Sequence, residues 1–206
     1  MLKVLGRANS INVQKVLWTC DELSVPLERE DLGGGFGGLD TPEYRQKNPN
    51  GLVPTIDDNG VIVWESNTIV RYLAARYGAG QLWPEDPAVR ADSDKWMDWQ
   101  LTTFWPDVRK IFLQLIRTPE DRRNAQVIEE ARIKAIDAAK ALNSALEGRK
   151  YLAGDVLTIG DIAVGVVAYR FFTLDFERPS LPHLESWHAR LADRPSFQRQ
   201  VLLPLS

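Results

Sequence analysis

The segment Asn48-Pro49-Asn50-Gly51-Leu52-Val53-Pro54-Thr55-Ile56 decides the fold. Its Asn-Pro and Asn-Gly pairs predict turns, and a strand starts at the Val53-Pro54 pair. Proline lacks the N–H that a central strand needs for its hydrogen bonds. A cis peptide bond before Pro54 would allow proline at this position. A trans proline at the start of the strand is an equal alternative. With a cis bond, the backbone N–H and C=O of Val53 face outward and can pair with an extended peptide ligand, as an added strand does.

The residues around this segment predict an α/β domain over 1–78. Downstream, residues 57–60 form a hairpin turn, 61–64 a return strand, and Ser66 caps a helix that ends at Gly78. Upstream, we expect a buried strand over 2–5, a helix from about residue 12 and an edge strand over 27–32. In that first helix the apolar side chains face inward, and the polar ones are expected outside: Gln14, Lys15, Asp21 and Glu22.

After a linker over 79–87 the pattern is helical throughout, which predicts an all-helical second domain over 88–206. We expect one long helix over 96–115 with a kink at Pro106, and further helices over about 127–146, 158–174 and 184–191. Thr158 and Asp161 have the spacing of a capping box, which we interpret as structural.

Composition excludes several classes of function. A hydrophobic content of 44% and a charged content of 26% are those of a globular protein, and the net charge of -3 with no basic run argues against nucleic acid or membrane as partners. A single cysteine, Cys20, excludes an intramolecular disulfide and suits a reducing cytoplasm; a buried position is its default. Two isolated histidines predict no metal site. The glycine-rich stretch 33–38 has the wrong spacing for a phosphate loop, so we expect a surface loop.

Two further features point to a ligand, each with a simpler structural alternative. Glu65 and Ser66 stand at a helix start, where free amides favour a carboxylate and the glutamate attracts an amine. Together they suit the α-amino acid end of a ligand, although either is also explained as a plain cap. Ser10, between the first strand and the first helix, can donate its hydroxyl to an anion or simply cap the helix.

In combination these features resemble the cytosolic glutathione transferases. NPNGLVPTI, a hairpin and then WESNTIVRYLA match that family's glutathione site in order and spacing, and GDVLTIGDIAV resembles its motif in the helical domain. The opening over residues 6–10 is similar to bacterial members that use serine or asparagine rather than tyrosine. The resemblance implies a thioredoxin-like domain followed by an all-α domain.

The resemblance also implies roles for individual residues. Val53, with Pro54 cis and Leu52 beside it, would bind the cysteinyl part of glutathione, while Glu65 and Ser66 would hold the γ-glutamyl end. Ser10 would donate to the sulfur, with Asn12 assisting and Asn9 as a rival. Arg45 and Lys47 are candidates for the glycyl carboxylate, and Trp64 is interpreted as a core residue.

The expected function is that of a glutathione transferase, which activates glutathione as a thiolate and conjugates it to an electrophile. Phe104, Trp105 and Phe112 are candidates for the pocket of the second substrate, with an ordinary core as their alternative. A glutathione-dependent disulfide reductase and a non-catalytic interaction module remain as other interpretations. The resemblance further implies a cytoplasmic homodimer that acts in detoxification, with glutathione as co-substrate and no metal.

Overall fold

The structure is a computed structural model that describes residues 1–206, and its first part is an α/β unit. Four short strands form one sheet in the order β2-β1-β3-β4: β1 (Leu2–Leu5), β2 (Leu27–Glu30), β3 (Thr55–Asp58) and β4 (Val61–Trp64). Strand β2 runs parallel to β1, whereas β3 runs antiparallel to both β1 and β4. The predicted β, α, β, α, β, β, α order over 1–78 is confirmed.

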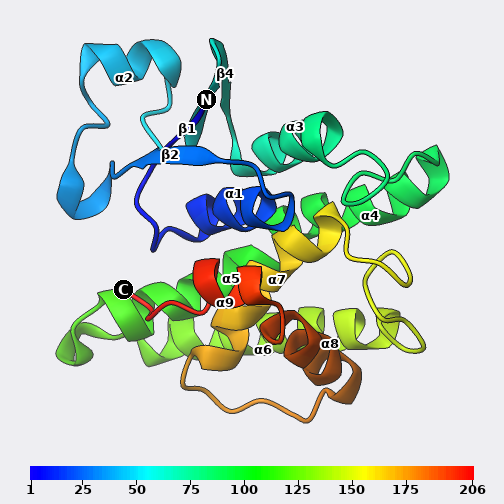
Figure 1. Cartoon of the computed structure of the whole chain (residues 1–206). Coiled ribbons are helices and arrows are strands. Elements are labelled where there is room, and N and C mark those ends of the chain that lie inside the picture. Colours follow the sequence, from blue (N-terminus) through cyan, green and yellow to red (C-terminus); the bar gives the residue numbers. More distant parts are fainter.

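Helices lie on both sides of this sheet. Helices α1 (Ile11–Glu22) and α3 (Ser66–Tyr77) pack side by side beneath it, and α2 (Pro42–Lys47) lies on the far side (Figure 1). The predicted surface loop over 33–38 is confirmed as largely exposed and contains only the short 3-10 turn η1 (Gly34–Phe36). The small core between sheet and helices consists of apolar residues from both layers: Leu2, Val4, Val13, Val16, Leu17, Cys20, Ile56, Ile69 and Leu73.

The second part is entirely helical, as predicted. A nearly unbroken helical run contains α4 (Pro87–Trp99), the π-helical segment η2 (Gln100–Phe104), α5 (Trp105–Phe112) and the π-helical segment η3 (Leu113–Arg117). The 3-10 turn η4 (Glu120–Arg122) leads into α6 (Ala125–Ala145), which is followed by α7 (Ile159–Thr173), α8 (Pro182–Ala192) and α9 (Pro195–Gln200). No helix is both long and apolar enough to span a lipid bilayer.

Some predicted details of the helices need correction. The long helix starts earlier than expected, at Pro87, and its irregularity is the π-helical segment that directly precedes α5 and Pro106. The sequence analysis did not anticipate α9. The capping box is confirmed, since the Asp161 carboxylate accepts from the backbone N–H of Thr158 at 2.9 Å. It starts α7, in which every residue from 159 to 168 is buried.

The two parts share the larger core. Trp18 of α1 and Val70 of α3 belong to the same apolar cluster as the helices of the second part. This packing overturns one expectation: Gln14 and Lys15, placed on the solvent side of α1, are each only 1% exposed. The reason is that α7 of the helical part covers Gln14, and that α3 together with η2 covers Lys15.

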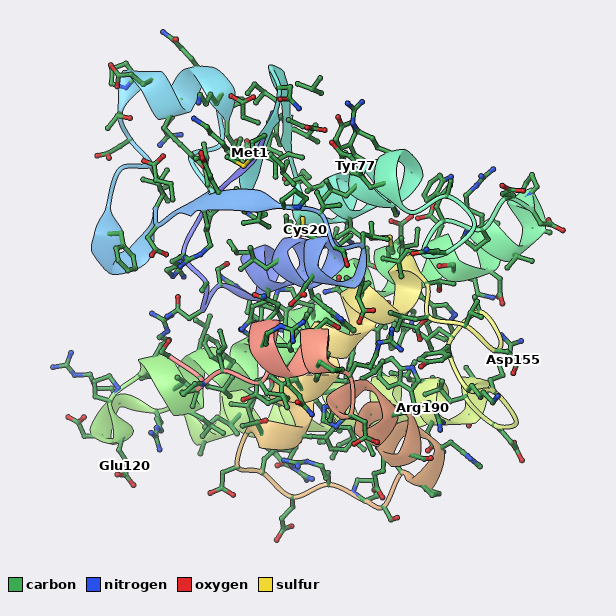
Figure 2. The ribbon with its side chains drawn as sticks, in the orientation of Figure 1. Met1, Cys20, Tyr77, Glu120, Asp155 and Arg190 are labelled. Atoms are coloured by element: carbon green, nitrogen blue, oxygen red, sulfur yellow. The ribbon has the colours of Figure 1, made fainter.

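Cys20 is buried at 1% exposure, as expected, on the side of α1 that faces the sheet (Figure 2). Burial raises the pKa of its thiol to about 12. The side chain therefore stays a protonated thiol at neutral pH, as a small apolar core residue does.

Candidate active site

A cleft of about 480 Å³ lies between the α/β part and the helical part. The loop before α1 and the loop before β3 form one wall, and α5 with η3 forms the other. The C-terminus reaches the same region, where Asn9 Nδ2 donates to Ser206 Oγ at 2.5 Å (Figure 1). Seven of the residues singled out from the sequence line this cleft: Asn9, Ser10, Asn12, Leu52, Val53, Trp105 and Phe112.

The Val53-Pro54 peptide bond is cis, so the first of the two alternatives is confirmed. No group of the chain forms a hydrogen bond with the backbone N–H or carbonyl of Val53, which lines the cleft. The preceding carbonyl, that of Leu52, is instead held by Tyr44 Oη at 2.6 Å and by Asn48 Nδ2 at 2.9 Å. A rigid loop therefore presents one free donor and one free acceptor to a ligand in the cleft.

Ser10 occupies the N-cap position of α1, with extended backbone and its carbonyl accepting from Gln14 N at 2.8 Å. Its hydroxyl forms no capping hydrogen bond and has no other partner in the chain. The Ser10 side chain therefore does not cap the helix, which was the simpler of the two interpretations. Ser10 brings an uncommitted hydroxyl to the cleft at the positive end of a helix.

The asparagines beside Ser10 are already engaged. Asn12 Oδ1 accepts from Ser66 Oγ at 3.3 Å, and Asn9 donates to Ser206. Among the three polar side chains at this helix start, only Ser10 has no hydrogen bond within the chain; Asn12 keeps its Nδ2 free and Asn9 its Oδ1.

The structure corrects the expected cap of α3. Glu65, not Ser66, is the N-cap residue, and Ser66 is the first residue of the helix. Glu65 has a positive φ of 69°, which is uncommon for a residue with a side chain and costs on the order of 1–3 kcal/mol. Its carboxylate is exposed and unpaired, so the start of α3 offers both free amides and an unpaired acid.

Glu65 and Ser66 do not themselves line the cleft. The hydrogen bond between Ser66 and Asn12 connects the start of α3 to the cleft, because Asn12 does line it. The two predicted ligand-binding regions therefore adjoin each other along the starts of α1 and α3.

Lys15 is a buried residue of this region that the sequence analysis missed. Its ammonium donates to Asn67 Oδ1 at 2.9 Å, to Gln100 Oε1 at 3.0 Å and to Ser66 Oγ at 3.4 Å. Burial without a carboxylate in contact lowers its pKa to about 7. No signal in the periodicity of α1 marks this lysine, because its partners come from α3 and from the helical part.

The three aromatic candidates for the second-substrate pocket divide into cleft residues and a core residue. Trp105 and Phe112 line the cleft, whereas Phe104 is 0% exposed and packs against Trp99 and Phe171, with ring centroids 5.5 and 5.6 Å away. Successive residues on a helix point about 100° apart, so neighbouring aromatics face different surroundings. Phe104 is therefore corrected from a pocket residue to a core residue. The interpretation of Trp64 as core was also wrong, since it is 36% exposed on β4.

Four arginines line the same cleft, and sequence reasoning missed all of them: Arg7, Arg109, Arg117 and Arg170. No Asp or Glu side chain lines it. The two earlier candidates for binding a carboxylate lie elsewhere, because Arg45 donates to the Pro49 carbonyl and Lys47 faces Asp57 at 3.9 Å. No group of three or more His, Cys, Asp or Glu side chains is placed to hold a metal ion.

Comparison with known families agrees with this geometry. Residues 5–81 match the family model described as glutathione S-transferase, N-terminal domain, and residues 104–195 match glutathione S-transferase, C-terminal domain. The chain belongs to the glutathione S-transferase family.

Individual relatives cover the whole chain. It is 41% identical to glutathione S-transferase GstB of Escherichia coli K12, with all of both chains aligned. The theta class glutathione S-transferase of Xanthomonas axonopodis pv. citri, solved with glutathione bound, is 44% identical and superimposes with a TM-score of 0.96 over 100% of this chain and 99% of that one. A Bombyx mori glutathione transferase is 28% identical, with a TM-score of 0.85 over 97% of this chain and 92% of that one.

Proposed function

We propose that this protein is a glutathione transferase, which binds glutathione along the starts of α1 and α3 and conjugates its sulfur to an electrophilic carbon. The observation that carries the proposal is the juxtaposition, in one cleft, of the uncommitted Ser10 hydroxyl and the unpaired backbone of Val53. The similarity to a structure solved with glutathione bound supports it.

In the proposed complex, glutathione lies extended across the two helix starts. The Val53 backbone pairs with its cysteinyl residue, beside Leu52 and the cis Pro54. Glu65 accepts from the γ-glutamyl ammonium, and Ser66 with the free amides of α3 meets the carboxylate of the same residue. Ser10 donates to the sulfur, Asn12 keeps Ser66 in place through their hydrogen bond, and Asn9 flanks the sulfur site.

The energetics of this arrangement suffice for activation. A free thiol has a pKa of about 8.5, and lowering it by about 2 units requires about 2.7 kcal/mol in favour of the thiolate. One hydrogen bond to an anion supplies about 1.5–3 kcal/mol, and the start of α1 adds about 0.3–1 kcal/mol. The gain in thiolate is at most about thirtyfold, so positioning of the second substrate must supply the rest of the rate.

The finer assignments follow from the same proposal. Residues 1–78 form the glutathione-binding domain, and residues 88–206 form the domain that contributes Trp105 and Phe112 to the pocket of the second substrate. The protein acts in the cytoplasm as a homodimer, and its physiological role is the detoxification of small electrophiles.

A glutathione-dependent disulfide reductase is the alternative function, in which glutathione rather than a protein thiol would attack the disulfide. A relay through a protein thiol would need Cys20, the only cysteine of the chain, which is buried, protonated and not among the residues lining the cleft. If the purified protein reduces a small disulfide faster than it conjugates a haloarene, disulfide reduction becomes the preferred function and conjugation the alternative.

The deciding experiment is a calorimetric titration of glutathione into the intact protein. We expect saturable binding that Glu65→Gln weakens by about tenfold, since the exchange removes a charge-assisted hydrogen bond. Glu28→Gln, an exposed acid on the edge strand β2, is the matched control and should bind as the wild type does. Absence of binding at millimolar glutathione would contradict the proposal and favour a non-catalytic interaction module.

A further inference from the structure

The face of the cleft opposite the glutathione side has an unusual composition for a pocket that accepts apolar molecules. Along α5 and η3 the cleft-lining residues are Trp105, Arg109, Phe112, Leu113 and Arg117, at the spacing of one helix face. Aromatic rings and guanidinium groups therefore alternate on this face. Arg170 of α7 lies behind Phe112, with its guanidinium 5.8 Å from the centre of that ring.

None of these four arginines pairs with an Asp or Glu side chain, and Arg109 and Arg170 are the two that matter for the second substrate. Arg109 is exposed and forms no hydrogen bond or ion pair with any residue of the chain. Arg170 is only 3% exposed, yet its partners are the neutral oxygens of Gln14 and Val166, and its buried Nε has no partner at all. Burial lowers the pKa of Arg170 to about 10. A buried cation without a counter-ion is costly, and an anion bound in the cleft would offset that cost.

The other two arginines, Arg117 and Arg7, lie away from the proposed site of the second substrate's carboxylate. Arg117 is engaged with the backbone oxygen of Ser206. Arg7 belongs to the loop before α1, on the glutathione side, and lies against Gly33 and Gly34. Glutathione brings carboxylates of its own, and Arg7 is the cation placed on its side of the cleft. Arg109 lies on the opposite side, on α5, and Arg170 of α7 lies between the two sides, where it donates to Gln14 of α1 and faces the ring of Phe112.

We infer that the second substrate of this enzyme is an aromatic electrophile that carries a carboxylate, with its ring against Trp105 and Phe112 and its carboxylate held by Arg109 and Arg170. This inference rests on the proposed transferase function and specifies the substrate class of the same site. Arginine suits the role because its planar donors match a carboxylate, while the rings bind the aromatic body.

The reaction with a benzylic halide illustrates the chemistry. The glutathione thiol loses its proton to solvent, and the resulting thiolate attacks the benzylic carbon. The C–S bond forms while the C–Cl bond breaks, and the electron pair of that bond leaves with chloride. The carboxylate of the substrate takes no part in the bond changes, so it acts only in binding and orientation.

The test compares two substrates of nearly the same shape, of which one carries a carboxylate and the other a neutral carboxamide: 4-(chloromethyl)benzoate and 4-(chloromethyl)benzamide, each with its uncatalysed rate subtracted. We expect the wild type to favour the benzoate in kcat/KM by about tenfold or more, the size of a hydrogen bond to a charged group. Arg109→Gln should abolish most of that preference, and Arg109→Lys should retain part of it. Lys110→Gln, one residue away and outside the cleft, is the control and should leave the preference unchanged.

A binding measurement makes the test independent of turnover. By calorimetry, S-(4-carboxybenzyl)glutathione should bind more tightly than its carbamoyl analogue to the wild type, and with nearly equal affinity to Arg109→Gln. Turnover of the benzamide at least as fast as that of the benzoate would overturn the inference and leave the transferase function in place. An equal loss for both substrates in Arg109→Gln would also overturn it. Turnover of neither substrate by a protein that conjugates glutathione to a haloarene would overturn this inference alone, whereas no turnover of any of these electrophiles, with glutathione bound, would contradict the transferase proposal as well.

Discussion

At the scale of single residues, Ser10 shows how position and chemistry combine. Its backbone starts α1, yet its hydroxyl leaves the capping bond unmade and lines the cleft. A serine at an N-cap normally accepts from an amide of the first turn, and that bond contributes about 1 kcal/mol to stability. Because the Ser10 hydroxyl lines the cleft and forms no capping hydrogen bond, it is available to bind a ligand.

Replacing Ser10 by Ala should raise the pKa of the bound glutathione thiol by up to about 2 units and lower turnover at pH 7 by up to about thirtyfold. Glutathione affinity should change little, because Val53, Glu65 and Ser66 hold the peptide. The pH dependence of thiolate ultraviolet absorbance in the complex measures this effect. Ser180→Ala, at an exposed site in the loop before α8, is the control. An unchanged thiol pKa in Ser10→Ala would move the role to Asn9 or Asn12.

Lys15 is a second residue whose environment determines its behaviour. The lysine is ordinary in the unfolded chain, with a pKa near 10.5, and burial lowers that pKa to about 7 in the folded protein. Between these values the unfolded state binds more protons than the folded state. Stability contributed by this site therefore rises with pH from about 7 upward, by at most about 1.4 kcal/mol per pH unit.

Lys15→Met should remove this dependence. Urea unfolding at about pH 7 and about pH 8.5 should show the wild type gaining up to about 2 kcal/mol relative to the variant over that interval. Cys20 is the same in both proteins, so the fall in stability that its raised pKa causes above the ordinary pKa of cysteine cancels in this comparison. Equal pH slopes for wild type and variant would mean that Lys15 stays charged in the folded protein.

At the scale of elements, α7 organises the helical part. Its first turn is closed by the capping box, and Asp161 of that turn also accepts from Trp187 Nε1 at 2.9 Å and from the backbone of Leu152 at 3.0 Å. One buried acid thus joins the start of α7 to α8 and to the preceding loop. The capping-box spacing predicted the local part of this arrangement, whereas the bond to Trp187 depends on the packing of α8.

Gly160 determines how closely α4 approaches α7. A Cβ at this position would lie 2.6 Å from the Ser93 carbonyl oxygen and 3.2 Å from Trp96 Cβ. Gly160→Ala should therefore force the helices apart and destabilise the protein by about 1–3 kcal/mol, although alanine favours helix. Denaturant unfolding measures the loss. Gly35→Ala, with open space around the added carbon, is the control. A Gly160→Ala variant as stable as the wild type would contradict this close approach.

At the scale of the whole molecule, the two parts are joined by buried apolar surface and by ion pairs. Trp18 of α1 is fully buried in the core of the helical part and donates to Glu22 at 2.8 Å. Arg194, before α9, pairs with the same Glu22 at 2.6 Å, and Arg71 of α3 pairs with Asp94 of α4 at 2.6 Å. Because α1 and α3 contribute to both cores, neither part buries its apolar surfaces alone.

We therefore expect the two parts to unfold in one cooperative transition. Hydrogen exchange should give the amides of β1 and β3 the same highest free energy of opening as those of α7. Trp18→Ala should lower both values together by about 3–5 kcal/mol. The exposed Phe36→Ala is the control. A lower opening energy for α7 alone would show that the two parts unfold separately.

The sequence by itself determined what depends on neighbours along the chain. The order of strands and helices over 1–78, the Val53-Pro54 turn, the capping box of α7 and the helical second part all follow from local spacing and backbone chemistry. The candidate ligand residues at the turn and the helix starts carry local signals of the same kind, and the family resemblance added their proposed roles.

The tertiary structure alone decided what depends on contacts between distant segments. An amphipathic pattern identifies the face of α1 that packs on the sheet, but it does not reveal that α3 and η2 cover Lys15 on another face. Neighbouring aromatics on one helix look alike in sequence, and only packing separates the buried Phe104 from the cleft-lining Trp105 and Phe112. The arginine-lined cleft arises in the same way, because its arginines come from the loop before α1, the continuous run of α5 and η3, and α7, which meet only in the folded chain.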